Sequence, residues 1–440
     1  MYGVTQSGFS SIILDAKNHL ISNPNDTVII NIDAGTYDIG GNGSNGIFIN
    51  SVVPGVNGRL IIKGAGMDST TLVFTEVDQD MIRISDSENI VLSDMHMTRE
   101  EYTVTQGFVQ SVGTGYIDLE LQSGFPDPLA LYNSASDQGR YLRRYTNSQT
   151  DPQVIQTNNG QIPWGYVNSV FTYPVLVSGN TWRFFLNDPN LLASNYSIGD
   201  LVGVKSKHEG ETYFIVGGSD ILIENIKWTH STRGVARFGT NNLTIRKCRI
   251  ERGDPINGQT PCMASPSGGP QMNQPNDAPS MNMIVDSCFI DSPGDDCVAF
   301  FNVDGGRVTN SVLKNSFSSR GIYIIPTAQN ICVANDSLIN NAIVGPYSIC
   351  EDPSLGLQEI EKNKFLVYPN PNKGRISIRS DSNCSTIRFS VFNALGVLLS
   401  SGTKYSTSVV GIDLDGESGC YILEIRSDDG GLEYHKILRE

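Results

Sequence analysis

The sequence has no long apolar run, since none approaches the ~20 residues that a helix needs to cross a bilayer. It also has no block of Lys or Arg, and its formal net charge at pH 7 is −15. A cationic surface that binds a nucleic-acid backbone or an anionic membrane is therefore not expected. Heavily sulfated or uronic-acid polymers are disfavoured for the same reason.

Metal-binding cysteine motifs are absent as well. The chain has 8 Cys, but none is arranged as a paired CxxC, so a structural zinc site is not expected. We predict neither a metal nor an organic cofactor. Cys384 and Cys420 are candidates for a disulfide in an exported tail domain, although the sequence leaves the connectivity open.

Charged residues make up only 18% of the 440-residue chain, whereas Gly is abundant at 44. The short apolar runs alternate or carry β-branched residues, which favours a mostly β protein. The length exceeds one ordinary core, so several units are expected.

Six segments share one pattern, in which a polar residue or Gly precedes alternating apolar positions, a polar or Cys pivot and a closing apolar residue. The register steps are 22 residues after Asp220, 23 after Asn282 and 25 after Gly305. The segments are NIVLSDMHM from Asn89, DILIENIKW from Asp220, NLTIRKCRI from Asn242, NMIVDSCFI from Asn282, GGRVTNSVL from Gly305 and NICVANDSL from Asn330.

A period in the low twenties is too short for two helices with their turns. We therefore predict a right-handed parallel β-helix, in which short strands stack about 4.8 Å apart. Cys248 and Cys288 are the pivots of two repeats, and they should lie in one interior column as small apolar side chains.

The coil pattern vanishes between about Glu101 and Lys205, where longer alternating strands such as GYIDLELQSG appear, and it resumes at YFIVGGSDILIENIKW. We therefore predict an all-β chain of several units. These are the N-terminal part of the β-helix at 1–100, an inserted antiparallel β-barrel at 101–205, the main coils with the catalytic site at 206–350, a linker at 351–363 and a C-terminal β-sandwich at 364–440.

The tail from about Lys364 resembles the C-terminal sorting domain of the type IX secretion system of Bacteroidetes. YPNP opens it, FNALGVLL matches its central strand and turn, GCYILEI its penultimate strand, and HKILRE its basic ending. The resemblance implies contact with the secretion machinery and export across the outer membrane, to the cell surface or beyond. Such cargo carries a signal peptide, whereas Met1 leads directly into YGVTQSGFSS, so we expect a truncated or processed start.

The body resembles the pectin-lyase-like β-helix superfamily of carbohydrate-active enzymes. GDDC, from Gly294 to Cys297, is similar to the Gly-Asp-Asp element of polygalacturonase-type glycoside hydrolases, and the layout is similar to the family 110 glycoside hydrolases, the α-1,3-galactosidases. The Asn-Thr-Asp, Gly-His-Gly and Arg-Ile-Lys elements of polygalacturonases are absent, and VAFF replaces the His that follows the pair in the α-galactosidases. The resemblance implies hydrolysis of glycosidic bonds in a polysaccharide or oligosaccharide.

Asp295 and Asp296 are the leading candidates for catalysis. The runs TRGVARF, DDCVAFF and SRGIYII align without gaps, which places Asp296 in one column with Arg233 and Arg320 as charge partners. A guanidinium one rung away should favour the ionised form of Asp296, and this anion should then raise the pKa of Asp295. Such splitting of two pKa values suits acid/base chemistry. The alternative is a solvated turn whose Arg and Asp residues only stabilise stacking.

Inverting glycoside hydrolysis needs a carboxylic acid that protonates the leaving oxygen and a carboxylate that activates water, roughly 6.5–9.5 Å apart. Adjacent strand residues such as Asp295 and Asp296 point oppositely, so a third acid is needed. Asp277 is the best candidate because it lies in a long Gly/Pro-rich loop, SGGPQMNQPNDAPSM. The resemblance to the α-galactosidases implies that Asp277 is the general acid and that Asp295 or Asp296 is the base. An Asx turn before Pro279 explains Asp277 equally well.

Further residues are candidates for substrate contact. His208 and Glu209, in KSKHEGETY, lie where the chain re-enters the coils, although a surface loop explains them as well. Trp228, His230 and Tyr323 would offer a stacking face for a sugar, although an aromatic residue at a coil position more often packs in the core.

Two other functions remain open. A polysaccharide lyase on the same fold would need a Lys or Arg base and usually Ca²⁺ held by several carboxylates, for which the Asp295 and Asp296 pair with Asp291 and Asp304 is a candidate. A non-catalytic surface adhesin would bind glycans along the coils. A carbohydrate is the expected partner in all three cases.

Overall fold

The computed structural model describes residues 3–41, 43–100, 102–131, 138–156, 160–207, 210–231, 233–350, 365–380, 386–393, 398–405, 409–414, 417–427 and 432–440. The chain divides into two compact units, Met1–Cys350 and Glu351–Glu440, and each is described by itself.

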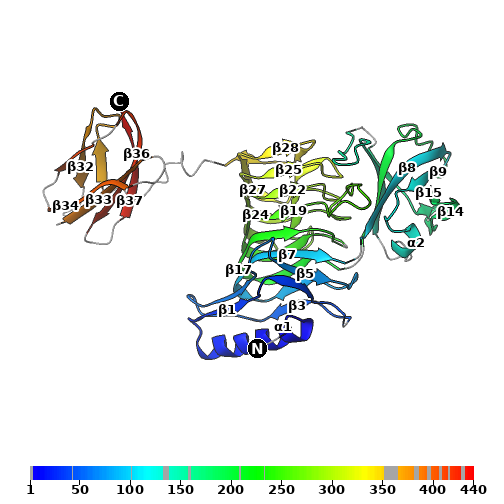
Figure 1. Cartoon of the computed structure of the whole chain (residues 1–440), viewed down its shortest axis with the longest axis horizontal. Coiled ribbons are helices and arrows are strands. Elements are labelled where there is room, and N and C mark those ends of the chain that lie inside the picture. The colour runs from blue at the N-terminus through cyan, green and yellow to red at the C-terminus, as the bar shows by residue number, and fades with distance from the viewer. Residues whose placement is uncertain are drawn as a thin grey trace. The chain divides into compact units, whose positions relative to one another are not determined.

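An all-parallel sheet of 21 strands curls round an axis and forms the body of the first unit, which confirms the predicted parallel β-helix (Figure 1). The strand pairings divide the coil into three faces. The first face contains β3 (Ile47–Asn50), β6 (Ile82–Ser85), the starts of β17 (Tyr213–Trp228) and β18 (Ala236–Arg246), β20 (Pro270–Met272), β23 (Val298–Phe300), β26 (Arg320–Ile324) and β29 (Ala342–Val344).

The second face contains β1 (Thr27–Asn31), β4 (Arg59–Lys63), the start of β7 (Glu88–Arg99), the later parts of β17 and β18, β21 (Ser280–Asp286), β24 (Val303–Thr309), β27 (Gln329–Ala334) and β30 (Ser348–Ile349). The third face contains β2 (Gly35–Asp38), β5 (Thr70–Phe74), the ends of β7 and β17, β19 (Arg249–Ile250), β22 (Phe289–Asp291), β25 (Val312–Lys314) and β28 (Ser337–Ile339).

The repeat in the sequence marks a corner of the coil. The residue that opens each repeat has a left-handed backbone, with φ between 52° and 79°, which Asn, Asp and Gly adopt most readily. Asn242 Nδ2 donates to Asp220 Oδ1 at 3.1 Å, and Asn282 Nδ2 donates to Asn242 Oδ1 at 2.9 Å. These ladders satisfy the polar groups of the corner, which explains why each repeat opens with a polar residue or Gly.

The interior of the coil is a continuous apolar core. Cys248 and Cys288 occupy equivalent positions on neighbouring coils and are only 2% and 4% exposed. The predicted interior cysteine column is therefore confirmed.

A helix that the sequence analysis did not predict covers the N-terminal end of the coil (Figure 1). α1 (Gln6–Ser22) begins after Thr5, whose side-chain oxygen accepts a hydrogen bond from a first-turn N–H. Its buried residues recur every three or four positions and join the core of the coil. They are Phe9, Ile13, Ala16 and Leu20. The helix thereby shields the first coil from water.

Between β7 and β17 the chain leaves the coil and forms a seven-stranded antiparallel sheet in the order β11-β10-β16-β8-β9-β15-β14, where the sequence predicted an inserted barrel. Its own core includes Trp164, Phe184 and Val202. The elements are β8 (Val104–Gly113), β9 (Tyr116–Leu121), α2 (Pro128–Leu131), β10 (Gln138–Tyr145), β11 (Gln161–Pro163), β12 (Tyr166–Val167), β13 (Val170–Phe171), β14 (Val175–Ser178), β15 (Thr181–Phe185) and β16 (Leu201–Lys207).

Buried contacts fix this insertion to the coils. Tyr145 of the insertion shares an apolar cluster with Met263 and Phe317 of the coil loops. Arg252 of the coil pairs with Asp151 of the insertion at 2.6 Å. The insertion and the coil are therefore packed together beside the loops that precede the first face.

The second unit is the predicted sandwich, in which two antiparallel sheets share one apolar core. Ile378 of one sheet and Leu423 of the other are both fully buried in it. The strands are β31 (Phe365–Tyr368), β32 (Arg375–Ser380) and β35 (Val409–Asp413) in one sheet, and β33 (Thr386–Asn393), β34 (Leu398–Tyr405), β36 (Gly419–Ser427) and β37 (Leu432–Arg439) in the other.

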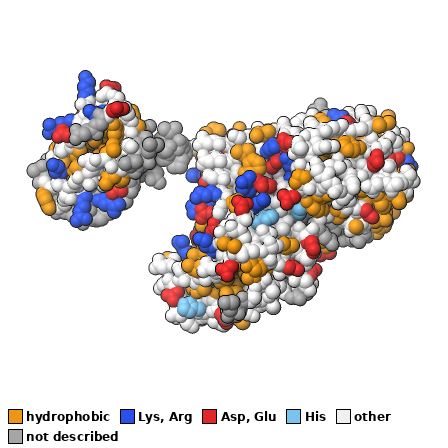
Figure 2. All heavy atoms as spheres, viewed as in Figure 1, with side chains coloured by type: hydrophobic (Ala, Val, Ile, Leu, Met, Phe, Trp, Pro, Cys, Tyr) orange, Lys and Arg blue, Asp and Glu red, His pale blue; other side chains and the backbone are white. Residues whose placement is uncertain are grey.

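A disulfide joins Cys332 and Cys350 in the first unit. Cys384, which the sequence offered as a partner for Cys420, lies outside the described residues. None of the helices in the described part of the chain has the length and apolarity that a membrane span requires. Figure 2 shows acidic and basic side chains interspersed along the visible face of the coils.

Candidate functional site

The loops that lead into the first face form one corner of the coil, which we call the entry corner. The insertion ends there, immediately before β17, and residues 251–269 form another long loop there, immediately before β20. Loops on a rigid scaffold commonly carry function. The entry corner is therefore the candidate functional site.

The strand register aligns one residue from each coil at the entry corner, in what we call the entry column. Neighbours in this column lie one rung apart, about 4.8 Å. In order along the axis the entry column is Asn45, Asp80, Glu211, Gly234, Gly268, Asp296 and Arg320. It carries two carboxylate centres, one at Asp80 and Glu211 and the other at Asp296.

Asp296 and Arg320 are neighbours in the entry column, as the sequence predicted. Arg320 Nε donates to Asp296 Oδ1 at 2.5 Å, and Ser318 Oγ donates to the same oxygen at 2.8 Å. Arg320 also reaches Asp295 Oδ1 at 3.2 Å. Asp296 is 2% exposed, whereas the Asp295 side chain is 23% exposed. The pair thus combines a buried carboxyl group with one that solvent reaches.

Burial raises the pKa of Asp296 from its usual value of 3.8 to about 6. The charge of Asp295 adds to this increase, and Arg320 opposes it. Arg320 favours the ionised form of Asp296, as expected, but the loss of hydration outweighs the attraction of the guanidinium, so the pKa of Asp296 rises overall. At a pH near 6 the buried Asp296 carboxyl therefore carries a proton in about half of the molecules.

Arg233 has a different partner from the one predicted. β20 adds a coil between Arg233 and Asp296 that the gapless alignment omitted. Arg233 Nε lies 3.3 Å from Glu211 Oε1. The expected pairing of Arg233 with Asp296 is therefore corrected to a pairing with Glu211.

Asp277 is not brought to the pair. Its Oδ2 atom lies beside Gly239, 3.9 Å from the position that a Cβ atom would take there. Gly239 is five residues along its strand from Gly234 of the entry column and two coils from Asp296. At about 3.3 Å per residue and 4.8 Å per coil, these steps place Asp277 on the order of 15–20 Å from Asp296.

The remaining predicted contacts separate into two groups. His208 and Glu209 lie outside the described residues. Tyr323 is half-buried beside the pair, where the Arg320 guanidinium carbon lies 4.1 Å from its ring centroid. Tyr323 is therefore placed to contact a ligand at the pair.

Trp228 and His230 do not form a sugar-stacking face with Tyr323. Trp228 is 2% exposed, and its ring packs edge-on against Tyr213 at a centroid distance of 5.5 Å. The His230 ring lies 3.8 Å from that of Tyr102, and burial lowers the pKa of His230 to about 4. Both side chains thus serve packing.

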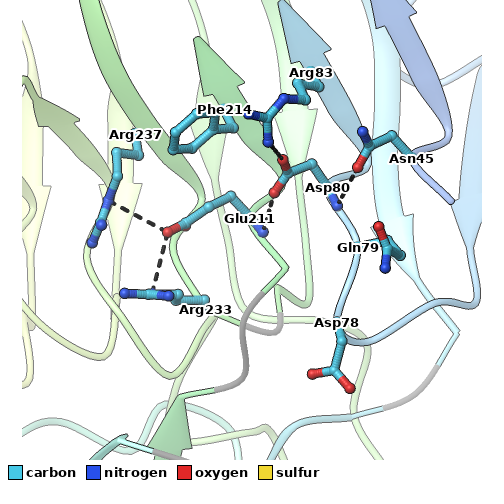
Figure 3. Close-up of a pocket in the computed structure, with 9 residues that line it drawn as sticks. All are labelled: Asn45, Asp78, Gln79, Asp80, Arg83, Glu211, Phe214, Arg233 and Arg237. Carbon is cyan, nitrogen blue, oxygen red and sulfur yellow. Dashed lines mark hydrogen bonds and ion pairs between the residues drawn. The ribbon is translucent and has the colours of Figure 1, made fainter. Parts of the chain in front are cut away.

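The second carboxylate centre opens into a pocket of about 290 Å³ (Figure 3). Glu211 Oε1 contacts the Nε atoms of Arg233 and Arg237 at 3.3 and 3.4 Å, and Asp80 Oδ2 contacts Arg83 at 3.0 Å. The charged residues that line this Asp80/Glu211 pocket are Asp78, Asp80, Arg83, Glu211, Arg233 and Arg237.

Side chains of the entry column also hold successive coils together at this pocket. Asn45 Oδ1 accepts from the Asp80 N–H at 3.1 Å, and Asp80 Oδ1 accepts from the Glu211 N–H at 3.0 Å. Glu211 Oε2 accepts from the Gly234 N–H at 2.7 Å. A Cβ at Gly234 would collide with Glu211 Oε2, so a side chain at this position would displace the Glu211 carboxylate.

Arg99 fixes the loops behind the pocket. It is 3% exposed and donates to the backbone carbonyls of Gln79 and Glu211 at 2.9 Å each. Burial raises the pKa of Glu211, whereas Arg237 and Arg233 oppose the increase. The pocket is therefore held in shape before any ligand arrives.

The carboxylates proposed for a calcium cage lie on different faces. Asp291 pairs with Arg252 at 3.0 Å on the third face, and Asp304 accepts from Asn330 at 2.6 Å on the second. Among the described residues, no group of three or more His, Cys, Asp or Glu side chains is arranged to hold a metal ion.

Sequence reasoning missed Asp80 and Glu211. Asp80 and Glu211 each lie two residues before the first inward-facing residue of a strand. Asp296 lies at the same distance before Val298, the first residue of β23. Glu211 is also only two residues from the predicted Glu209. This shared spacing in the sequence could have indicated that the three acids lie in one column.

Comparisons with known proteins identify the tail. Residues 366–439 match the family described as the secretion system C-terminal sorting domain. The chain is therefore exported by the type IX secretion system, to the cell surface or outside the cell. No curated protein matches the chain in sequence.

Solved structures of carbohydrate-active enzymes show a distant likeness to the chain. The catalytic unit of the GH87 α-1,3-glucanase from Streptomyces thermodiastaticus is 12% identical, with a TM-score of 0.34, over 77% of this chain and 39% of that one. The Agl-KA catalytic domain is 13% identical, with a TM-score of 0.31, over 76% and 45%. The A-module of the Azotobacter vinelandii mannuronan C-5 epimerase AlgE6 is 10% identical, with a TM-score of 0.30, over 76% and 74%. The chain spans less than half the length of the first two.

Proposed function

We propose that this exported protein is a glycoside hydrolase that cleaves a polysaccharide or oligosaccharide at the entry corner. Asp296 is the proton donor to the leaving oxygen, and Asp295 is the base that activates water. The reaction inverts the anomeric configuration. Asp277, at the far end of the strands, takes no part.

One observation carries this proposal: a buried carboxyl and a solvent-facing carboxylate share one guanidinium at the corner where the loops converge. The pKa of Asp296 is raised to about 6, so it retains a proton at a pH where an ordinary carboxyl is ionised. Asp295 is the more exposed of the two and is accessible to water. Neighbouring carboxyls in unlike environments are the arrangement that acid/base hydrolysis of glycosides uses.

Arg320 contacts both carboxyls, and this proximity supports a pair made of Asp295 and Asp296 in place of the expected third acid. Asp296 Oδ1 and Asp295 Oδ1 contact Arg320 at 2.5 and 3.2 Å. Because one planar guanidinium contacts both, roughly 8 Å is the upper limit of the distance between these two oxygens, and the proposal requires a separation near this limit. Inverting enzymes hold their two carboxyls roughly 6.5–9.5 Å apart, which leaves room for a water molecule.

Neighbouring side chains have supporting roles. Arg320 ties the two acids together, and Ser318 orients the Asp296 carboxyl through its 2.8 Å hydrogen bond. Tyr323 offers a partly exposed ring for the substrate, since aromatic faces pack against the apolar side of polar ligands.

The proposal is tested by incubating the full chain with a panel of plant, algal and host glycans and following new reducing ends by NMR. We expect release from at least one glycan, with the first product in the inverted anomeric configuration. Retention of configuration would overturn the inverting assignment, and no release from any glycan would overturn the hydrolase. A product with an ultraviolet-absorbing double bond would instead identify a lyase. Glycan binding without turnover, unchanged in Asp295→Asn, would identify an adhesin.

A further inference from the structure

The Asp80/Glu211 pocket is separate from the Asp295 and Asp296 pair. Three steps of the entry column lead from Glu211 to Asp296, which corresponds to about 14 Å along the axis. Pocket and pair thus lie along one corner of the coil, and no step of the proposed hydrolysis uses the pocket.

The lining of the pocket balances its charges. Three arginine and three acidic side chains line it, and the contacts between them are mutual, as Figure 3 shows for Glu211 with Arg233 and Arg237. A ligand with a net charge of either sign therefore meets as much repulsion as attraction. A neutral ligand meets no such penalty.

The same lining offers both kinds of hydrogen-bonding group. Guanidinium groups donate and carboxylates accept, while the amides of Asn45 and Gln79 do both. A sugar hydroxyl also donates and accepts, so a polyhydroxyl ligand satisfies both sets at once. Phe214 adds an aromatic surface to the lining, with the Arg83 guanidinium carbon 4.6 Å from its ring centroid.

We propose that the Asp80/Glu211 pocket binds one neutral sugar unit and acts as a second subsite about 14 Å from the Asp295 and Asp296 pair. The inference rests on the proposed function, because it names the class of its substrate. That substrate is an uncharged glycan long enough to occupy both positions.

The size and rigidity of the pocket fit this role. Its volume of about 290 Å³ is of the order of a small-ligand site. Arg99 and the hydrogen bonds of the entry column hold its loops in place, so little ordering is required on binding.

The binding test uses the full chain with Asp295→Asn, so that turnover does not consume the probe. Methyl glycosides of glucose, galactose and mannose are titrated by ligand-observed NMR, with galacturonic acid and glucosamine as the anionic and cationic arms. We expect at least one neutral glycoside to bind about tenfold more tightly than either charged sugar. Tighter binding of a charged sugar, or no binding of any neutral one, would overturn the inference.

Two pocket variants locate the binding. Phe214→Ala and Arg237→Gln are each added to the Asp295→Asn chain. Each should weaken binding of the neutral sugar at least fivefold, which is the effect expected from the loss of one contact with the ligand. Arg249→Gln is the matched control, because Arg249 is a half-exposed arginine that pairs with Glu251 on the third face. Asp80 and Glu211 are left intact because they hold the coils together. An equal effect of all three variants would overturn the assignment to the pocket.

Separate measurements distinguish this inference from the proposed function. If the chain binds a sugar through Phe214 but hydrolyses no glycan, the proposed sugar site in the pocket stands and the proposed hydrolase activity is overturned. If the unmodified chain hydrolyses a glycan but no sugar binds in the pocket, the proposed hydrolase activity stands and the proposed second subsite is overturned.

Discussion

Asp296 and Arg320 lie on neighbouring coils in matched register, and Arg320 Nε donates to Asp296 Oδ1 at 2.5 Å. Arg320 opposes the effect of burial on Asp296, so its charge limits how far the pKa of this carboxyl rises. The guanidinium also holds Asp295. One side chain thus sets both the geometry and the protonation of the pair.

Arg320→Gln should move the pH dependence of turnover. Without the positive charge, the pKa of Asp296 rises further above 6, so the alkaline limb of kcat/KM shifts to higher pH. At the optimum pH, kcat should fall about 10- to 100-fold, because the Arg320 side chain no longer holds the two carboxyls in position. Rates of reducing-end release between pH 4 and pH 9 measure both effects. An alkaline limb that stays in place would contradict this role of Arg320.

Asp295→Asn and Asp277→Asn should differ sharply. Loss of the general base costs on the order of 10²- to 10⁴-fold in turnover. Asp277, whose carboxylate lies beside Gly239, should tolerate the change with turnover within about twofold of the unmodified chain, as for other surface substitutions. Thermal unfolding of both variants checks that each is folded. Equal losses would restore Asp277 to the catalytic machinery.

The stability of the first unit should depend on Asp296 in a defined direction. The pKa of Asp296 is about 6 in the folded protein and near its usual 3.8 when unfolded, so the folded state binds the proton more tightly. Its contribution is fully present below pH 4 and is lost as pH rises to about 6. Two pKa units correspond to about 2–3 kcal/mol.

Asp296→Asn cannot titrate, so the free energy of unfolding of the unmodified chain should fall relative to that of the variant between pH 4 and pH 7. Asp336, whose pKa is also raised to about 6 by burial, contributes equally to both chains and cancels in this comparison. Urea unfolding at each pH measures the difference. A constant difference across the range would show that Asp296 has an ordinary pKa.

Lys205 should link the insertion to the catalytic pair. This lysine of β16 is 2% exposed, and its Nζ donates to the carbonyl of Gly294, next to Asp295. Lys205→Met leaves that carbonyl without its donor, which should cost about 1–3 kcal/mol and lower turnover. Lys17→Met is the matched control, because Lys17 also donates to a carbonyl, that of Asn50, but at an exposed position. Similar effects of both changes on turnover would separate the insertion from catalysis.

The coil could be predicted from the sequence because each corner restricts which residue types can occupy one particular position. Asn89, Asp220 and their equivalents adopt left-handed backbone conformations, which few other residues tolerate. α1 was not predicted, although its buried residues Phe9, Ile13, Ala16 and Leu20 show helical spacing. A single amphipathic segment is a weaker sequence signal than a β pattern that repeats along the chain.

The site was predictable only where the coil spacing was regular. Asp296 and Arg320 lie on adjacent coils of 24 residues, so the alignment of their segments was correct. Between Arg233 and Asp296 a long loop hides the extra strand β20, and the alignment failed there. The direction of the Asp296 pKa was also not predictable, because it depends on burial that a sequence alignment does not show.

The most direct test of the catalytic pair is the turnover of Asp296→Asn on a glycan that the unmodified chain hydrolyses. With the unfolding temperature unchanged, reducing-end release at pH 6 should fall at least about 100-fold, since the amide cannot donate the proton to the leaving oxygen. Release at the unmodified rate by a folded Asp296→Asn protein would contradict the account.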